Sequence, residues 1–282
     1  MLPDWIRTRY SYEGIHDMKH LLRRYGLSTV CEEARCPNKS ECFRKPTATF
    51  MILGSLCTRG CSFCSVDKGL PFPPETDEPL RVSLAAKEMG LKYIVLTSPT
   101  RDDLFDGGAG HFRDTVLEVK RHISFAKVEV LTPDFMGSMD SLRTVISSCP
   151  DVFNHNVETV PSLYPEVRHQ ANYERSLNLL YEAKKLKPHI KTKSGLMLGF
   201  GESFDEVLGV FHDLKSAGCE MITIGQYLQP SKRNLPVKEY VLPKTFERLK
   251  DLALDMGFNS VASSPLVRSS MNAEEVFSNV AF

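Results

Sequence analysis

From residue 48 the chain reads Ala48-Thr49-Phe50-Met51-Ile52-Leu53-Gly54, and after two more residues it continues Cys57-Thr58-Arg59-Gly60-Cys61-Ser62-Phe63-Cys64. The first stretch is a short apolar run, as expected of a buried strand. Five similar runs follow, separated by amphipathic segments, and they cover residues 92–98, 127–132, 152–159, 192–200 and 221–228. Strands that alternate with helices predict an α/β fold built on a parallel sheet with right-handed crossovers.

The segments between the runs carry the end signals of helices. Residues 203–217 begin with Ser203-Phe204-Asp205-Glu206, a capping box, and Gly218 follows them. Six strand–helix units can form a doubly wound sheet or a curved partial barrel, and in both folds the site lies at the carboxyl ends of the strands. The cysteines of residues 57–64 follow the first strand, so they lie where we expect the chemistry.

Length, composition and charge limit the class of protein. The chain has 282 residues, 42% hydrophobic and 25% charged, which suits one large domain or two small ones. The strand–helix units cover residues 47–256, which leaves an N-terminal extension, residues 1–46, and a C-terminal tail, residues 257–282. Lys and Arg together number 35, as do Asp and Glu. This zero net charge speaks against nucleic acid as the main partner.

Targeting signals are not evident in the sequence. The longest apolar stretches are too short to span a bilayer. The first ten residues have neither the apolar core of a secretory signal nor the composition of a transit peptide. We therefore expect a cytoplasmic protein without a membrane partner. Thiols stay reduced in that compartment, so clustered cysteines indicate metal ligands.

Six of the eight cysteines form two triplets. The first triplet is Cys31, Cys36 and Cys42, and the second triplet is Cys57, Cys61 and Cys64. The C-x3-C-x2-C spacing of the second triplet can hold three corners of a cubane iron–sulfur cluster and leave the fourth iron open to another ligand. A zinc knuckle, in a protein that only binds, is the alternative. Zinc sites usually join paired C-x2-C units into four ligands, and no fourth Cys or His lies near the second triplet.

The second triplet, with the aromatic Phe63 before its last cysteine, resembles the radical S-adenosylmethionine (SAM) superfamily. In that superfamily the open iron of a 4Fe-4S cluster binds the amino and carboxylate groups of the methionine moiety of SAM. The reduced cluster then cleaves SAM and releases a deoxyadenosyl radical. The resemblance implies a partial (β/α)6 barrel, here with a cluster-binding N-terminal extension and a C-terminal tail.

Further motifs between about residues 28 and 271 resemble the lipoyl synthase family. They are residues 31–38, 97–98, 101–109, 155–159, 193–199 and 225–230. Enzymes of this family insert two sulfur atoms, at C6 and C8 of an octanoyl chain that is amide-linked to a lysine of a lipoyl carrier domain. The resemblance implies SAM and two 4Fe-4S clusters as cofactors. The second triplet would hold the radical-generating cluster, and the first triplet would hold an auxiliary cluster that donates the sulfur.

The resemblance also implies partners. These are octanoylated carrier domains, from the E2 subunits of 2-oxoacid dehydrogenases and the H protein of glycine cleavage, and a low-potential electron donor such as ferredoxin or flavodoxin. Lys19, Arg23 and Arg24 form a basic patch that could meet an acidic carrier, although a solvated helix face is the simpler interpretation. The enzymatic alternative is a methylthiotransferase, but such enzymes usually carry an RNA-binding module, and we see none here.

The C-terminal tail contains Arg268-Ser269-Ser270-Met271, where the family has Arg-Ser-Ser-Tyr. The family pattern makes Ser270 the fourth ligand of the auxiliary cluster, although the residues by themselves leave Ser269 open. An oxygen ligand suits an iron that must be released. Arg268 is expected to orient that serine or to contact a cluster sulfide. Met271 lacks the hydroxyl and rigid ring of tyrosine, which affects how the tail is anchored.

Polar residues at two strand ends are candidate contacts for SAM, alongside Phe63. Arg101 and Asp102 follow the second strand, where the superfamily contacts the SAM amino group, but an Asx turn or helix cap explains them equally well. Asn156 and Glu158 share one face of the fourth strand. Because a carboxylate that faces the interior needs a partner, we favour contact with SAM or substrate over a core network.

Overall fold

The computed structural model describes residues 2–7, 15–38, 42 and 48–278. They divide into two compact units, which we describe separately. The N-unit comprises residues 8–60 and 65–153, and the C-unit comprises residues 1–7, 61–64 and 154–282. Within the described ranges, no helix combines the length and the apolar character needed to cross a membrane.

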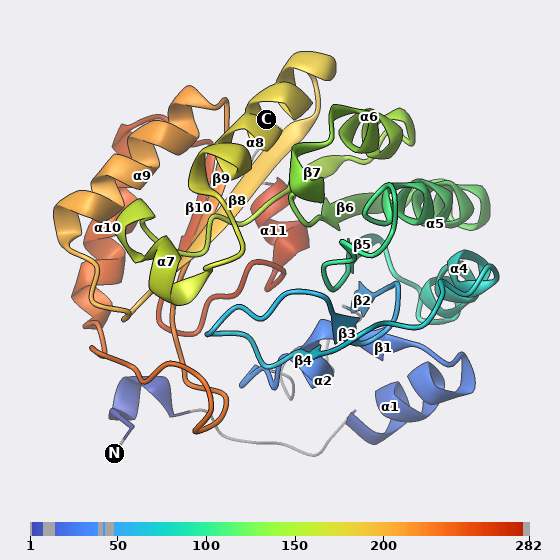
Figure 1. The fold of residues 1–282 in the computed structure, drawn as a ribbon, viewed down its shortest axis with the longest axis horizontal. Coiled ribbons are helices and arrows are strands. Elements are labelled where there is room, and N and C mark those ends of the chain that lie inside the picture. The colour runs from blue at the N-terminus through green and yellow to red at the C-terminus, as the bar shows by residue number, and fades with distance from the viewer. Residues whose placement is uncertain (1, 8–14, 39–41, 43–47, 279–282) are drawn as a thin grey trace. The chain divides into compact units, whose positions relative to one another are not determined.

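The N-unit contains a mostly parallel sheet. Its strand order is β1 (Ser28–Thr29), β2 (Thr49–Met51), β5 (Tyr93–Thr97), β6 (Lys127–Leu131) and β7 (Val152–Asn154). β2 pairs with β5 and β5 with β6 in parallel, whereas β1 is antiparallel to β2. Helices α4 (Glu78–Glu88), α5 (Ala109–His122) and α6 (Met139–Ser147) lie side by side along the strands (Figure 1). Every residue of β5 is buried, as expected of a strand covered on both faces.

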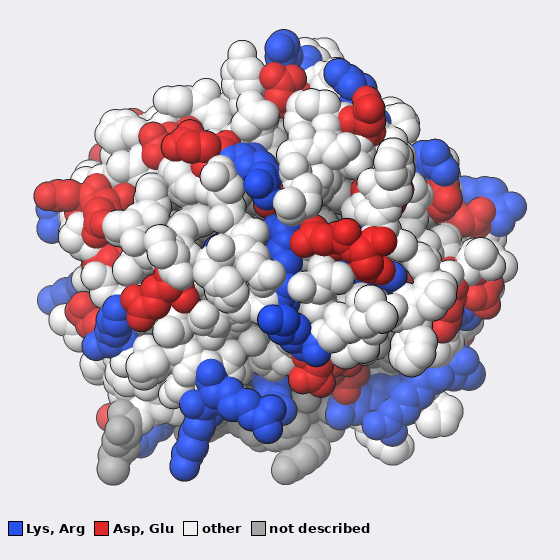
Figure 2. Space-filling model, in the orientation of Figure 1, with Lys and Arg blue, Asp and Glu red and all other residues white. Residues whose placement is uncertain are grey.

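Shorter elements of the N-unit carry the cysteines. Helix α1 (Ile15–Arg24) leads through β1 into α2 (Val30–Glu33), which contains Cys31. A separate two-stranded parallel sheet pairs β3 (Leu56–Cys57) with β4 (Asp67–Lys68). Basic side chains gather over α1, at the lower right of Figure 2. Lys19 and Arg24 of this patch pair with Glu32 and Glu88, so the patch is partly neutralised.

The C-unit contains three parallel strands, β8 (Lys191–Leu198), β9 (Met221–Gln226) and β10 (Ser260–Ser263). Helices α8 (Tyr173–Leu186), α9 (Phe204–Ser216) and α10 (Pro243–Asp255) pack along them (Figure 1). The predicted capping box is confirmed, since the Ser203 side chain accepts from Glu206 N and the Glu206 side chain accepts from Ser203 N. The remaining elements are η1 (Asp4–Ile6), η2 (Phe135–Gly137) of the N-unit, η3 (Pro161–Leu163), α7 (Tyr164–Val167) and α11 (Ala273–Ser278).

The predicted α/β class with a mostly parallel sheet is confirmed, and each of the six predicted runs contains an observed strand. The run at 152–159 is shorter than predicted, because β7 ends at Asn154 and Glu158 adopts a left-handed φ of 66°. β10 lies within residues 257–282, where we expected no strand, since Ser260-Val261-Ala262-Ser263 has only two apolar residues. Closure into a partial barrel stays a prediction.

Candidate functional site

The second triplet begins at the end of β3 with Cys57 in the N-unit, and Cys61 and Cys64 belong to the C-unit. The C-unit holds its part as a tight turn, in which Cys64 N donates to Cys61 O over 3.0 Å. The side chain of Asn234 donates to Cys64 O over 2.8 Å. These bonds fix the backbone of the turn independently of any metal.

Phe63 packs into the apolar core of the C-unit. Its ring centroid lies 6.4 Å from that of Phe200, edge to face, and Phe200 stacks on Tyr227 at 4.3 Å. Such aromatic pairs add stability beyond the area that they bury. Phe63 therefore anchors the turn between Cys61 and Cys64. Whether it also contacts SAM stays a prediction.

In the N-unit, Arg59 is buried, with 5% of its side chain exposed. Its guanidinium donates to both oxygens of Asp102, from Nε over 2.6 Å and from Nη2 over 2.8 Å, and to Asp134 Oδ1 over 2.6 Å. Burial by itself would lower the pKa of Arg59, but the bonds to the two carboxylates outweigh it and raise the pKa above its ordinary value. The sequence analysis gave Arg59 no role, and only its place between two cysteines singled it out.

Arg101 is also buried, with 1% exposed, and its hydrogen bonds are internal. It donates to both oxygens of Asp103 over 2.9 Å, to Leu53 O over 2.8 Å and to Phe72 O over 2.9 Å. The hydrogen bond and charge of Arg101 lower the pKa of the Asp103 carboxyl. These bonds give Arg101 a structural role that differs from the Asx turn or helix cap considered from the sequence, and its contact with SAM stays a prediction. Asp102 is held by Arg59 in a similar way.

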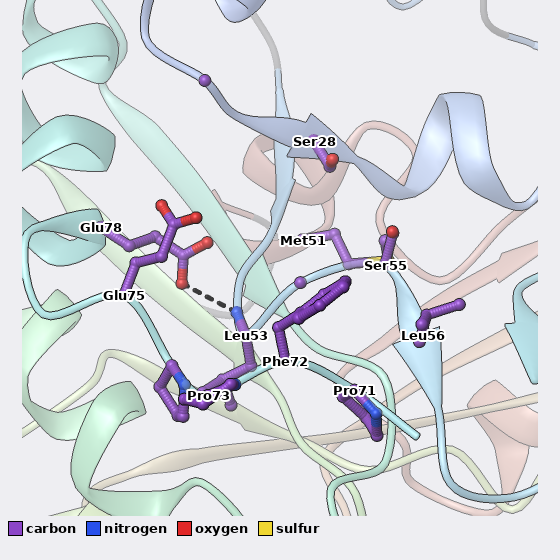
Figure 3. A pocket seen from close by; sticks show the side chains of 13 residues that line it. Ser28, Met51, Leu53, Ser55, Leu56, Pro71, Phe72, Pro73, Glu75 and Glu78 are labelled. Atoms are coloured by element: carbon purple, nitrogen blue, oxygen red, sulfur yellow. Dashed lines mark hydrogen bonds between the residues drawn. The ribbon is translucent and has the colours of Figure 1, made fainter. Parts of the chain in front are cut away.

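A cavity of about 230 Å³ lies in the N-unit beside the segments that Arg101 joins. Leu53 and Phe72 line it with Leu56, the neighbour of Cys57, as Figure 3 shows. Its carboxylates are both engaged: Glu78 accepts from Leu53 N over 2.8 Å and contacts His111, and Glu75 pairs with Arg81. The cavity therefore has both polar and apolar walls, and its two carboxylates already have partners.

The first triplet is brought together in the N-unit. Cys36 N donates to Cys31 O over 3.2 Å, which folds the chain back on α2. A hydrogen bond with the Cys42 thiol, together with burial and the neighbouring Cys36, raises the pKa of Cys31. Cysteine thiolates are the donors that iron–sulfur clusters take, so the first triplet stays a predicted cluster site. Within the described ranges, no three His, Cys, Asp or Glu residues are arranged to hold a single metal ion.

Within the C-unit, the C-terminal tail contacts Asn154 and Asn156. Ser269 Oγ donates to Asn156 Oδ1 and accepts from Asn154 Nδ2, each over 2.9 Å. Asn156 Nδ2 donates to Glu158 Oε1 over 3.1 Å, so these two side chains lie together. Burial raises the pKa of the Glu158 carboxyl, although Arg168 and Asn156 act in the opposite direction. Asn156 thus contacts the serine motif directly, and Glu158 is linked to it through Asn156.

Gly225 of β9 lies against the C-terminal tail, and the sequence gave no separate prediction for it. A Cβ placed there would lie 2.2 Å from Val267 O and 3.1 Å from an Arg268 nitrogen. Arg268 Nη1 in turn donates to Val267 O over 2.6 Å. Only glycine lets the tail approach β9 this closely. The signal in the sequence was a glycine inside a strand, in the family-like segment at residues 225–230.

Known proteins resemble this chain over most of its length. The model of the radical SAM superfamily matches residues 51–214, so the fold and the cysteine segment belong to a radical SAM enzyme. The chain is 52% identical to a lipoyl synthase of Caldanaerobacter subterraneus subsp. tengcongensis, over 96% of this chain and 95% of that protein. It is also 52% identical to a lipoyl synthase of Alkaliphilus metalliredigens, over 97% and 94%. The chain belongs to the lipoyl synthase family.

Solved structures support the fold. Methylornithine synthase superposes with a TM-score of 0.59 at 15% identity, covering 89% of this chain and 75% of that chain. Streptococcus suis SuiB bound to S-adenosylmethionine gives a TM-score of 0.61 at 14% identity, covering 89% and 60%. At such identities the likeness concerns the fold alone.

Proposed function

We propose that this enzyme inserts two sulfur atoms, at C6 and C8 of a protein-bound octanoyl-lysine, to give the lipoyl cofactor. The observation that carries the proposal is the pair of cysteine triplets in a chain that belongs to the lipoyl synthase family. Its substrates would be octanoylated carrier domains, such as 2-oxoacid dehydrogenase E2 and the glycine cleavage H protein. A ferredoxin or flavodoxin would supply electrons.

In this proposal Cys57, Cys61 and Cys64 hold the cluster that, when bound with SAM, supplies radical chemistry. The protein contributes a preset loop. Hydrogen bonds from Asn234 and the packing of Phe63 fix its C-unit part, and Arg59 fixes its N-unit part. Ligands that are already positioned lose less entropy when they bind.

The auxiliary 4Fe-4S cluster would be held by the first triplet and by Ser270. The hydroxyl of Ser269 already donates a hydrogen bond to Asn156 and accepts one from Asn154. Ser269 therefore suits an anchor for the tail, which leaves its neighbour Ser270 as the oxygen ligand. Arg268 stays a predicted orienting residue, and its bond to Val267 O shapes the same turn.

The two serines can be separated by experiment. Ser270→Ala removes the proposed ligand and is expected to lower lipoyl product about tenfold or more, with loss of auxiliary-cluster absorption. Ser269→Ala removes only anchoring hydrogen bonds and is expected to keep that absorption, with a smaller loss of product. Iron analysis, visible spectra and product mass spectrometry report the difference. The reverse order of the two variants would transfer the ligand role to Ser269.

Asn156 and Glu158 are the first candidates to test for contact with SAM or substrate, because they are held by hydrogen bonds, whereas Arg101 and Asp102 are held by ion pairs. Since the pKa of Glu158 is raised in the folded chain, its ionised form destabilises the fold at neutral pH. Its contribution to stability is favourable at low pH and is lost as the pH rises through its pKa in the unfolded and then the folded chain.

Glu158→Gln is therefore expected to raise the unfolding temperature of the cluster-free protein at pH 7.5 and to weaken SAM binding. The gain in unfolding temperature should shrink as the pH falls and the wild-type carboxyl becomes protonated. Thermal unfolding across pH and calorimetric titration with SAM measure the two effects. Glu247→Gln, at an exposed position of α10, is the control and should change neither. Unchanged SAM affinity in Glu158→Gln would remove Glu158 from the binding site.

The decisive test is mass spectrometry of an octanoyl-lysine peptide after anaerobic incubation with reconstituted enzyme, SAM and a strong reductant. A product with two added sulfurs, lost in Cys36→Ala, would support both the reaction and the sulfur source. Deoxyadenosine without any change in the peptide would point to another substrate, as expected of a methylthiotransferase. By simple counting of sites, about eight irons per chain support the enzyme, whereas about two zincs would support the binding protein.

A further inference from the structure

We propose that Arg59 is a positioning residue, which locks the segment between Cys57 and Cys61 onto the ends of β5 and β6. The contacts of its side chain would hold the backbone N–H of Arg59 toward Cys57 Sγ before any iron is bound. The inference rests on the proposed function only in taking Cys57 as a cluster ligand. All contacts that carry it lie within the N-unit.

The side chain of Arg59 joins two strand ends. Asp102 follows β5 and accepts two parallel hydrogen bonds, and Asp134 follows β6 and accepts a third. Asp134 has 1% of its side chain exposed, so this pair is shielded from water and salt. The planar guanidinium fits a carboxylate with two fixed donors, which the ammonium group of lysine does not provide. The geometry of the segment therefore depends on arginine and not only on positive charge.

The backbone beside Arg59 is held to the same loop. Thr58 N and Thr58 Oγ1 both donate to Thr100 O over 3.0 Å. Asp102 N donates back to Thr58 Oγ1 over 3.1 Å. Two consecutive residues of the cysteine segment are thus bonded to the three residues that end at Asp102. The Arg59–Asp102 ion pair adds a side-chain contact to these hydrogen bonds.

The end of β6 is shaped around the same guanidinium. Asp134 Oδ1 accepts from Met136 N over 3.1 Å as well as from Arg59, and Met136 Sδ lies 3.0 Å from Arg59 Nη2. Phe135 and Met136 have left-handed φ values of 47° and 52°. Such conformations persist in non-glycine residues only where surrounding contacts enforce them. Phe135 is buried against Phe112, and Asp134 and Arg59 fix the turn from its other side.

The consequence for the site is the bond from Arg59 N to Cys57 Sγ, with a donor–acceptor distance of 3.4 Å. Hydrogen bonds to sulfur ligands help to set the reduction potential of an iron–sulfur cluster, because they stabilise its more negative reduced state. Partners beyond the ligands also hold the ligands in place. A released Arg59 would lose this N–H···S bond, so the cluster would become harder to reduce.

The test compares Arg59→Lys with Arg81→Lys. Arg81 is also an ion-paired arginine of the N-unit, bonded to Glu75 and Asp77, but it lies outside the cysteine segment. Asp134→Asn, which keeps Arg59 and removes the negative charge of one of its partners, is the second variant in case Arg59→Lys folds poorly. Hydrogen exchange on the cluster-free protein measures how firmly the segment between Cys57 and Cys61 is held. Anaerobic redox titration measures the midpoint potential of the reconstituted cluster.

We expect amide exchange at Thr58 to rise about tenfold or more in Arg59→Lys and by less in Asp134→Asn, with no change in Arg81→Lys. We also expect a lower midpoint potential in Arg59→Lys. Unchanged exchange at Thr58 in Arg59→Lys would show that Arg59 does not hold the segment, and it would overturn the proposal. Faster exchange with an unchanged potential would reduce Arg59 to a purely structural residue and also overturn the proposal. If no chain acquires a cluster, the proposed function fails, and exchange in the cluster-free protein still decides whether Arg59 holds the segment.

Discussion

Replacing Cys57 with alanine is expected to reduce deoxyadenosine formation to background and to leave the iron at the first triplet in place. Cys57 supplies one of only three cysteine ligands of the proposed radical-generating cluster, and the segment after it is already bonded to the end of β5. Two thiolates cannot hold a cubane that also needs an open iron for SAM. Iron should fall from about eight to about four per chain, by the same counting of sites.

The control for this variant is Cys219→Ala. Burial raises the pKa of Cys219 to about 12, and its thiol donates to Met221 O, so it is a structural thiol and not a metal ligand. Cys219→Ala is expected to keep both the iron and the deoxyadenosine. Anaerobic iron analysis and chromatography of deoxyadenosine measure both variants. SAM cleavage that persisted in Cys57→Ala would disprove the assignment of the second triplet to the radical-generating cluster.

Gly225→Ala is expected to lower lipoyl product about 10- to 100-fold while deoxyadenosine formation stays within about twofold. The added methyl group would lie 2.2 Å from Val267 O, so the tail that carries Ser270 must move. Overpacking of this kind costs about 1–3 kcal/mol. A cost of this size would lower the fraction of molecules whose tail packs against β9 by about the same factor as the expected loss of product. The cysteine segment does not touch this contact, so radical formation should survive.

Gly209→Ala is the matched control for Gly225→Ala. Gly209 lies in α9 of the same unit, and a Cβ there meets no atom within 4 Å. Alanine is the better helix former, so this variant should be at least as stable as the wild type. Product mass spectrometry and auxiliary-cluster absorption compare the two. Equal product yields would show that the position of the tail does not depend on its close approach to Gly225.

Much of the protein could be predicted from local sequence. The six apolar runs gave the parallel strands and the α/β class, because a buried strand needs an unbroken run of apolar residues. The capping box was readable because its partners lie three residues apart. The cysteine spacing indicated an iron–sulfur cluster, because C-x3-C-x2-C differs from the paired C-x2-C units of zinc sites. Motifs across the chain indicated the lipoyl synthase family, and the relatives confirmed it.

Other features depended on pairs that are far apart in sequence. Arg59 and Asp134 meet only because β3 and β6 bring their ends together, and neither residue has a local pattern that indicates the other. The hydrogen bonds of Ser269 with Asn154 and Asn156 join residues more than 110 positions apart, so the residues by themselves could not indicate them. The need for glycine at 225 comes from the carbonyl of Val267 in the tail.

The sequence by itself determined the six central strands and the family, and it predicted the metal-binding chemistry, because each depends on residue type and spacing along the chain. Tertiary structure alone decided which partners the polar residues already have inside the fold. Arg101 shows the difference: its type and position suited a contact with SAM, yet its donors are used by Asp103 and two backbone carbonyls. A hydrogen-bond donor serves a ligand only if no nearer acceptor has taken it, and only the packed structure supplies those acceptors.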